Sequence, residues 1–99
     1  VHEVFCGDLE GRGDDEARER FDAVYDAWLA GDLRAHLPGG ESALDLRARF
    51  LPAVERLTGG VDGTVLIASH GAAIRLASAA LLGDTAETLY VPNTGLVIL

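Results

Sequence analysis

Residues 64–83 constrain the fold more than any other stretch of this sequence. Thr64–Ser69 is a short run rich in apolar and β-branched residues, which predicts a strand buried on both faces. Ala72–Leu82 contains only two polar residues and is followed by Gly83, which predicts a mostly buried helix with a glycine at its C-terminal end. The two residues between these elements form a junction.

This junction, His70-Gly71, has the features of an anion site. The N-terminus of a helix presents unbonded backbone N–H groups and the positive end of the helix dipole, and anions bind there. Gly71 has no side chain to obstruct a ligand, and His70 is the only titratable residue between Asp62 and Arg75. The spacing alone leaves two alternatives open: a histidine that faces a ligand such as phosphate, and a histidine satisfied inside the core.

Two amphipathic helices are predicted before this stretch. The first takes its N-cap from Asp14-Asp15 and runs to about Ala30, with apolar residues on one stripe and acids on the opposite face. The second opens near Ser42, which forms a pair like a capping box with Asp45, and it stops at residues 58–60. The connections are short, and the sequence contains no repeat and no low-complexity linker.

The last sixteen residues are predicted to add three small elements. These are a turn of helix at 84–89, a turn at 92–95 and a closing strand at 96–99. A sheet with so few strands leaves hydrogen-bonding edges and apolar faces uncovered. We therefore expect residues 1–99 to aggregate or self-associate when isolated, and a homo-oligomer is left open.

Composition excludes several classes of partner. The net charge is −8, and residues 1–32 hold ten acids and three arginines, a balance of −7. This excess of acids argues against a surface for nucleic acid or for an anionic membrane. No apolar run approaches the ~18–20 residues of a membrane-spanning helix. The single cysteine, Cys6, permits no internal disulfide, so we expect a cytoplasmic protein.

Three separate segments carry a family resemblance. They are Glu3 with the Gly7-Asp8-Leu9-Glu10-Gly11 segment, Pro38-Gly39-Gly40-Glu41-Ser42, and Ser69-His70-Gly71 after an apolar run. In this order they resemble the C-terminal half of the histidine phosphatase superfamily, the phosphoglycerate-mutase-like group. The resemblance implies an α/β three-layer sandwich, with a mostly parallel sheet and helices on both faces.

The resemblance also implies that part of the domain lies outside this sequence. The family's nucleophile is a histidine in an N-terminal Arg-His-Gly motif, and a second arginine follows some tens of residues later. Neither is found here. The chain has no methionine and begins inside a motif, so we expect residues 1–99 to be the C-terminal part of a single histidine phosphatase domain.

The roles of four residues follow from the resemblance. His70 matches the family's second histidine, which lies beside the transferred phosphoryl group and stabilises its charge. Glu3 matches the glutamate that donates a proton to the leaving oxygen and then acts as base for water. Gly71 and Ala72 are expected to bind the substrate at the start of the helix. No metal and no cofactor is implied.

The expected function is hydrolysis of a phosphomonoester through a phosphohistidine, with a small phosphorylated substrate or inorganic phosphate as the partner. Two alternatives stay open within the same fold: a phosphoglycerate mutase, and a non-catalytic binding or assembly module. An acyl hydrolase that uses a serine or cysteine is a distant third, because no Gly-x-Ser-x-Gly elbow is present. The sequence does not identify the substrate.

Three other residues have competing interpretations. Glu41 is either a second carboxylate of the site or a capping residue of the helix that follows, and we favour the structural role. Ser42 is more readily a helix cap than a nucleophile. Cys6 is more readily a small apolar packing residue than a reactive thiol, because no base or orienting residue is specified near it.

Overall fold

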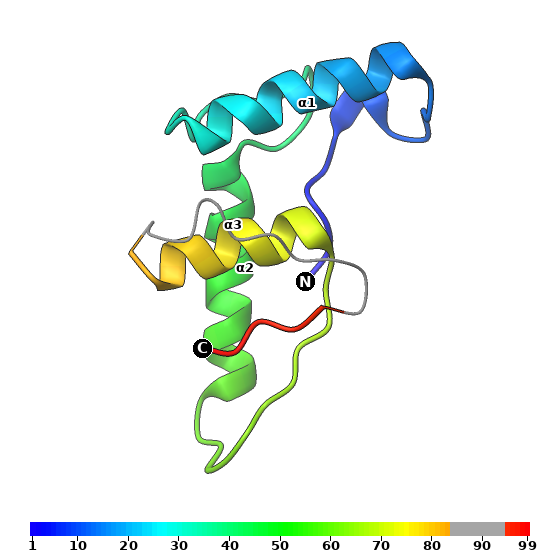
Figure 1. The fold of residues 1–99 in the computed structure, drawn as a ribbon. Helices are drawn as coiled ribbons and strands as arrows, with labels where there is room; N and C mark the ends of the chain where they lie inside the picture. Colours follow the sequence, from blue (N-terminus) through cyan, green and yellow to red (C-terminus); the bar gives the residue numbers. More distant parts are fainter. Residues whose placement is uncertain (84–94) are drawn as a thin grey trace. The chain divides into compact units, whose positions relative to one another are not determined.

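The structure is a computed structural model that describes residues 1–83 and 95–99. Its elements are the short 3₁₀ helix η1 (Gly7–Leu9) and the helices α1 (Asp15–Leu29), α2 (Ala43–Thr58) and α3 (Gly71–Leu81) (Figure 1). The chain divides into two compact units. Val4–Asp45 form the α1 unit, and Val1–Glu3 with the chain from Leu46 onward form the α3 unit.

Helix α1 begins at the predicted cap. The Asp14 carboxylate accepts a hydrogen bond of 3.2 Å from the backbone N–H of Ala17, which satisfies one of the unbonded groups at the helix start. The Arg12 guanidinium donates two hydrogen bonds to the same carboxylate, at 3.0 and 2.8 Å, and it lowers the pKa of Asp14 to about 2. Beyond the helix, Gly31 adopts a φ of 102°, which ends it. The prediction for this helix is confirmed.

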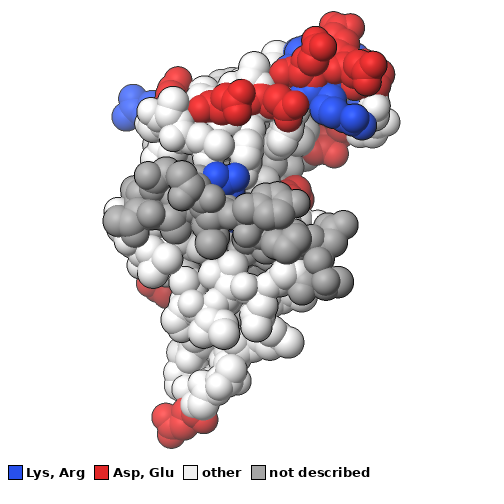
Figure 2. Space-filling model, viewed as in Figure 1, with Lys and Arg blue, Asp and Glu red and all other residues white. Residues whose placement is uncertain are grey.

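The α1 unit buries a small apolar cluster. Leu9, Ala17 and Leu37 form its centre, and Cys6, Phe21 and Val24 pack against them. The cluster therefore joins η1, one face of α1 and the connection that follows. The opposite face of α1 carries exposed acids, and Figure 2 shows acidic and arginine side chains gathered over this helix.

The aromatic residues of α1 pack in the same unit. The rings of Phe21, Tyr25 and Trp28 contact one another, with centroids 5.9 to 6.3 Å apart. Trp28 is buried, and its indole Nε1–H donates a 2.7 Å hydrogen bond to the carbonyl of Ala35. This bond satisfies the only polar atom of the ring, so the aromatic stripe is core packing.

Helix α2 begins at the predicted capping box and ends at the predicted residue. The Ser42 hydroxyl accepts from the N–H of Asp45 at 3.1 Å, and the Asp45 carboxylate accepts from the N–H of Ser42 at 3.0 Å. The backbone bond from Ser42 lowers the pKa of Asp45 below its ordinary value. The last helical residue is Thr58, directly before Gly59-Gly60.

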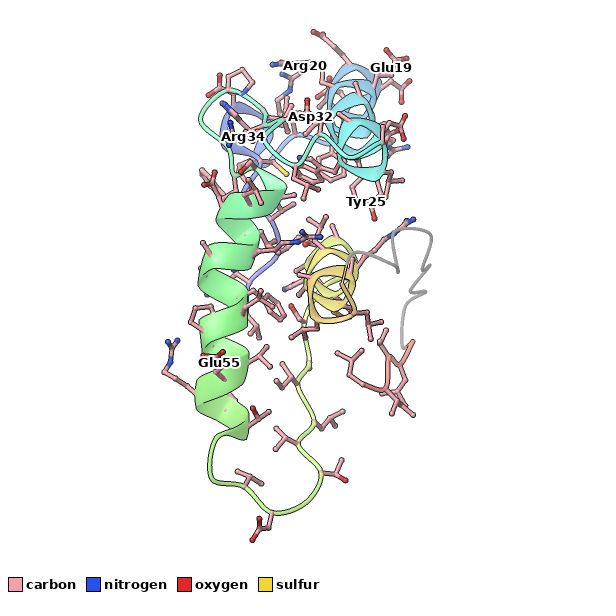
Figure 3. The ribbon with its side chains drawn as sticks, turned by 90° about the vertical axis from the view of Figure 1, so that its left-hand side faces the viewer. Glu19, Arg20, Tyr25, Asp32, Arg34 and Glu55 are labelled. Atoms are coloured by element: carbon pink, nitrogen blue, oxygen red, sulfur yellow. The ribbon has the colours of Figure 1, made fainter. Side chains whose placement is uncertain are left out.

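Helices α2 and α3 lie against each other in the α3 unit. Both helices are seen side by side in Figures 1 and 3. Arg47 of α2 donates from its Nε to the carbonyl oxygen of Leu76 in α3, at 3.1 Å. The buried residues of α3 are Ala73, Leu76, Ala77, Ser78 and Ala79. The helix stops before Gly83, which has a φ of 75°. The prediction of a buried helix with a glycine after it is confirmed for Gly71–Leu81.

The predicted α/β three-layer sandwich is wrong for the described residues. They contain helices, and no described segment forms a β-strand or a sheet. The predicted strands at 64–69 and 96–99 have no regular secondary structure. A strand exists only through the hydrogen bonds it exchanges with a neighbouring strand, so an apolar pattern cannot supply one without a partner. The predicted helical turn at 84–89 and most of the turn at 92–95 lie outside the described residues.

The residues expected in strands show instead an alternation of exposure. From Thr64 to His70, exposed residues alternate with half-buried ones, and Leu66 is 80% exposed. In Figure 3 the side chains of this segment project to both sides of the chain. Leu96, Ile98 and Leu99 are also exposed. The expected burial of the 64–69 segment on both faces is therefore wrong.

Candidate active site

The candidate site is the N-terminal end of α3. His70 is the N-cap, with φ −117° and ψ 160°, and its carbonyl accepts the first helical hydrogen bond, from Ile74 N–H at 2.8 Å. The N–H groups of Gly71, Ala72 and Ala73 therefore have no acceptor within the helix. The His70 side chain is exposed and makes no capping bond, so the alternative of a histidine buried in the core is wrong.

The side chain of Glu3 meets two of these N–H groups. Its Oε1 accepts a hydrogen bond from Ala73 at 2.7 Å, and its Oε2 accepts one from Ala72 at 3.1 Å. Each oxygen of the half-buried carboxylate is thus engaged, which fixes the plane of the group at the positive end of the helix dipole. An acidic side chain lies where the junction predicted an anion.

The backbone that carries Glu3 is held by two other side chains. Arg49 of α2 donates from Nη2 to the carbonyl of His2 at 3.1 Å and to the carbonyl of Glu3 at 2.7 Å. The Ser69 hydroxyl donates to the carbonyl of Val1 at 2.6 Å. The first three carbonyls of the chain are therefore each bound by a side chain of the α3 unit.

Comparison with known proteins identifies the family to which this chain belongs. A sequence model of the histidine phosphatase superfamily (branch 1) matches residues 1–99, the whole of the chain. The chain belongs to this superfamily. No solved structure gives a significant match.

Several curated relatives of this chain share a name. A protein of Methylobacterium radiotolerans named 2,3-bisphosphoglycerate-dependent phosphoglycerate mutase is 43% identical over 82 residues, which cover 76% of this chain and 37% of the relative. Proteins of the same name from Methylorubrum extorquens and Methylorubrum populi are 38% identical over 95 residues, which cover 90% of this chain and 43% of each relative. The chain thus spans about two fifths of the length of these relatives.

Within the histidine phosphatase chain, the structure brings the four predicted site residues together. Glu3 contacts the backbone of Ala72, and His70 and Gly71 directly precede it. In this conformation the N–H of Ala72 donates to Glu3, so a substrate contact by Ala72 would require Glu3 to release it. The catalytic and substrate-binding roles of these residues remain predictions.

No contact was assigned to Arg49 or to Ser69 from the sequence. Both donate hydrogen bonds to backbone carbonyls of residues 1–3. Every residue has a backbone carbonyl, so a sequence pattern does not show which of them accepts such a bond. Arg49 flanks the buried stripe of α2 just as Arg47 does, and Arg47 binds the backbone of α3 instead. In the sequence, Arg49 is marked only by its place next to the apolar Phe50, and spacing alone does not reveal its contact.

Three other residues have structural roles in the α1 unit. Glu41 precedes α2, its Oε1 accepts from Phe5 N–H at 2.8 Å, and its own N–H donates to Phe5 carbonyl at 2.8 Å. These two bonds hold the N-terminal loop against the start of α2, which supports the structural role that we favour. Ser42 is a helix cap, as predicted. Cys6 packs on the apolar cluster, and its thiol lies 3.7 Å from the carbonyl of Val4.

Among residues 1–83 and 95–99, no group of three or more His, Cys, Asp or Glu side chains is arranged to hold a metal ion. In the same part of the chain, every helix is too short or too polar to cross a lipid bilayer.

Proposed function

We propose that the complete protein hydrolyses a small phosphomonoester through a phosphohistidine, with Glu3 as the proton-transfer residue and His70 as a ligand of the phosphoryl group. The observation that carries the proposal is the Glu3 carboxylate held at the start of α3, directly beside the residue that matches the family's second histidine. Membership of the histidine phosphatase superfamily supports the reaction class.

The reaction needs two displacements at phosphorus. In the first, a histidine nitrogen from outside residues 1–99 attacks phosphorus, the bond to the leaving oxygen breaks, and Glu3 gives that oxygen a proton. In the second, a water oxygen attacks the phosphohistidine, the phosphorus–nitrogen bond breaks, and Glu3 takes a proton from the water. Inorganic phosphate and the alcohol are the products, and Glu3 ends protonated as it began.

The hydrogen bonds of Glu3 in this structure are compatible with its role as base in the second displacement. A carboxylate accepts hydrogen bonds and does not donate them, and both Glu3 oxygens act as acceptors here. This is the form of Glu3 that would take a proton from water. The exposed His70 side chain would bind an equatorial oxygen of the phosphoryl group, where charge accumulates in the transition state.

A mutase is the second candidate, and the names of the relatives favour it. In that reaction the phosphohistidine gives its phosphoryl group to a hydroxyl of a bound phosphorylated acid and not to water. Glu3 and His70 would keep the same roles, because both reactions share the phosphoenzyme. Residues 1–99 therefore do not distinguish a phosphatase from a mutase, and a measurement of which reaction the complete protein catalyses does.

The test uses the complete protein. Incubation with an aryl phosphate, followed by rapid denaturation, should trap an acid-labile and alkali-stable phosphoryl group on a histidine. Release of phosphate should be lowered about 10²–10³-fold by His70→Asn, while His36→Asn, at an exposed histidine of the α1 unit, should leave the rate near that of the parent. Interconversion of phosphoglycerates faster than phosphate release would replace the phosphatase with the mutase. Absence of any phosphoenzyme would favour the non-catalytic module.

A further inference from the structure

We propose that Arg49 is a positioning residue that holds Glu3 in place for proton transfer, an inference that rests on the proposed role of Glu3. A single guanidinium nitrogen of Arg49 binds both carbonyls that flank the Glu3 Cα, His2 C=O at 3.1 Å and Glu3 C=O at 2.7 Å. The donor is always charged, and such bonds are shorter and stronger than neutral ones.

The contacts of Arg49 complement those of α3. The helix start binds the carboxylate of Glu3 through Ala72 and Ala73, and Arg49 binds the main chain on both sides of its Cα. A glutamate side chain with several rotatable bonds is thereby fixed at both ends. Proton transfer requires the carboxylate within hydrogen-bond reach of the reacting oxygen, and a displacement of about 1 Å can cost 10²-fold in rate.

The chain itself offers a matched control. Arg47 lies two residues earlier in α2, is also half-buried, and also donates to a backbone carbonyl, that of Leu76 in α3 at 3.1 Å. This bond joins α2 to the middle of α3. Loss of Arg47 therefore tests the effect of removing a structural arginine, and loss of Arg49 tests the effect on Glu3.

The first experiment compares leaving groups in the complete protein. For an alkyl phosphate, whose leaving oxygen needs a proton, Arg49→Met should lower kcat/KM by about 10–10²-fold. For an aryl phosphate with an acidic phenol the loss should be several-fold smaller, and Arg49→Lys, which keeps a charged donor, should recover part of the rate. The double variant Glu3→Gln/Arg49→Met should lose no more than Glu3→Gln alone, because both changes remove one function.

Arg47→Met is expected to lower kcat/KM equally for the two substrates, if it lowers it at all. The same equal loss in Arg49→Met would overturn the inference, provided that Glu3→Gln still loses more on the alkyl phosphate than on the aryl phosphate. The larger loss of Glu3→Gln on the alkyl phosphate would then support the proposed role of Glu3 even though Arg49 does not position it. A complete protein that turns over neither substrate would overturn the proposed function itself, and the catalytic part of this inference with it.

The second experiment measures position without activity. The N–H groups of Ala72 and Ala73 have no acceptor within α3, so their protection from hydrogen exchange depends on Glu3. Their exchange should speed up at least tenfold in Glu3→Ala and in Arg49→Met, and it should stay unchanged in Arg47→Met. Fast exchange in Glu3→Ala with parental exchange in Arg49→Met and Arg49→Lys would show that Arg49 does not position the carboxylate.

Discussion

The Glu3 carboxylate accepts a 2.7 Å hydrogen bond from the backbone N–H of Ala73, a residue 70 positions later in the chain. Closing a loop of this length costs conformational entropy, so a single bond of this kind does not hold the two residues together by itself. Arg49 and Ser69 add three hydrogen bonds to the carbonyls of residues 1–3. The N-terminal residues are therefore part of the α3 unit, and the loss of any one of these hydrogen bonds is expected to weaken the others.

A glycine pair in the loop of the α1 unit predicts a difference in stability. Gly7 has a φ of 54°, and a Cβ there would overlap the carbonyl of Pro38 and the backbone of Gly39. Gly11 has a φ of 78°, with no atom within 4 Å of a Cβ. Gly11→Ala should cost about 1–2 kcal/mol of unfolding free energy through φ alone, and Gly7→Ala about 2–5 kcal/mol through φ and the clash.

Urea unfolding of the complete protein, with both variants measured in parallel, checks this prediction. The close approach has a function in the fold, because it lets the N–H of Asp8 donate to Pro38 at 3.0 Å. Equal costs for the two variants would mean that the contact between the loop and residues 38–40 is absent in solution.

The Asp14 carboxylate predicts a pH dependence of stability. Its hydrogen bond with Arg12 lowers its pKa from 3.8 to about 2 in the folded protein. A lowered folded pKa means that the stabilisation is complete above the unfolded value and is lost as the pH falls toward the folded value. The part of the unfolding free energy due to Asp14 should therefore be constant above about pH 4 and decrease between pH 4 and pH 2.

Unfolding curves of the parent and of Asp14→Ala, recorded from pH 7 to pH 2, measure this contribution as a difference. Asp22→Ala is a control at an exposed acid of the same helix. The difference between parent and Asp14→Ala should shrink below pH 4, whereas that for Asp22→Ala should not follow the same course. A difference that grows as the pH falls would contradict the Arg12–Asp14 pairing.

The helices were predictable because their signals are local. An N-cap, a capping box and a glycine after the last turn each act within a few residues, as Asp14, Ser42 and Gly83 do here. The absence of strands could not be predicted in the same way, because the pattern of Thr64–Ser69 indicates only that the segment is apolar. Whether such a segment becomes a strand depends on a neighbour, and no described residue supplies one.

The site was predictable in part for a related reason. The junction at His70 predicts an anion site because it lies at the start of a helix, and the family resemblance identified Glu3 as a candidate catalytic residue. That the anion of this structure is Glu3 itself could not be read from either observation, since it depends on the path of the chain over 69 to 70 residues. The bonds of Arg49 to the carbonyls of His2 and Glu3 could not be predicted either, because they join residues 46 to 47 positions apart.

Exposed apolar side chains predict the behaviour of residues 1–99 in isolation. Leu66 is 80% exposed and Ile98 is 84% exposed, and Leu96 and Leu99 are exposed as well. Large exposed apolar groups promote association. The isolated chain should sediment as a self-associating species, and it should not hydrolyse an aryl phosphate, because the nucleophile is expected elsewhere. A monomer that turns over substrate at ~1–10³ s⁻¹ would require a nucleophile among these residues.

Glu3 is proposed to move the proton in both displacements, and pre-steady-state kinetics of Glu3→Gln in the complete protein test this role most directly. With an aryl phosphate, phosphorylation needs little proton donation, whereas hydrolysis of the phosphohistidine needs a base. The variant should therefore release a rapid burst of about one phenol per enzyme, accumulate phosphohistidine, and then turn over about 10²-fold more slowly than the parent.

With an alkyl phosphate the same variant should show no burst, because the first step is then slow as well. Glu55→Gln, an exposed glutamate on α2 (Figure 3), should behave as the parent on both substrates. Parental turnover of both substrates by Glu3→Gln, with no accumulated phosphohistidine, would contradict the assignment of Glu3.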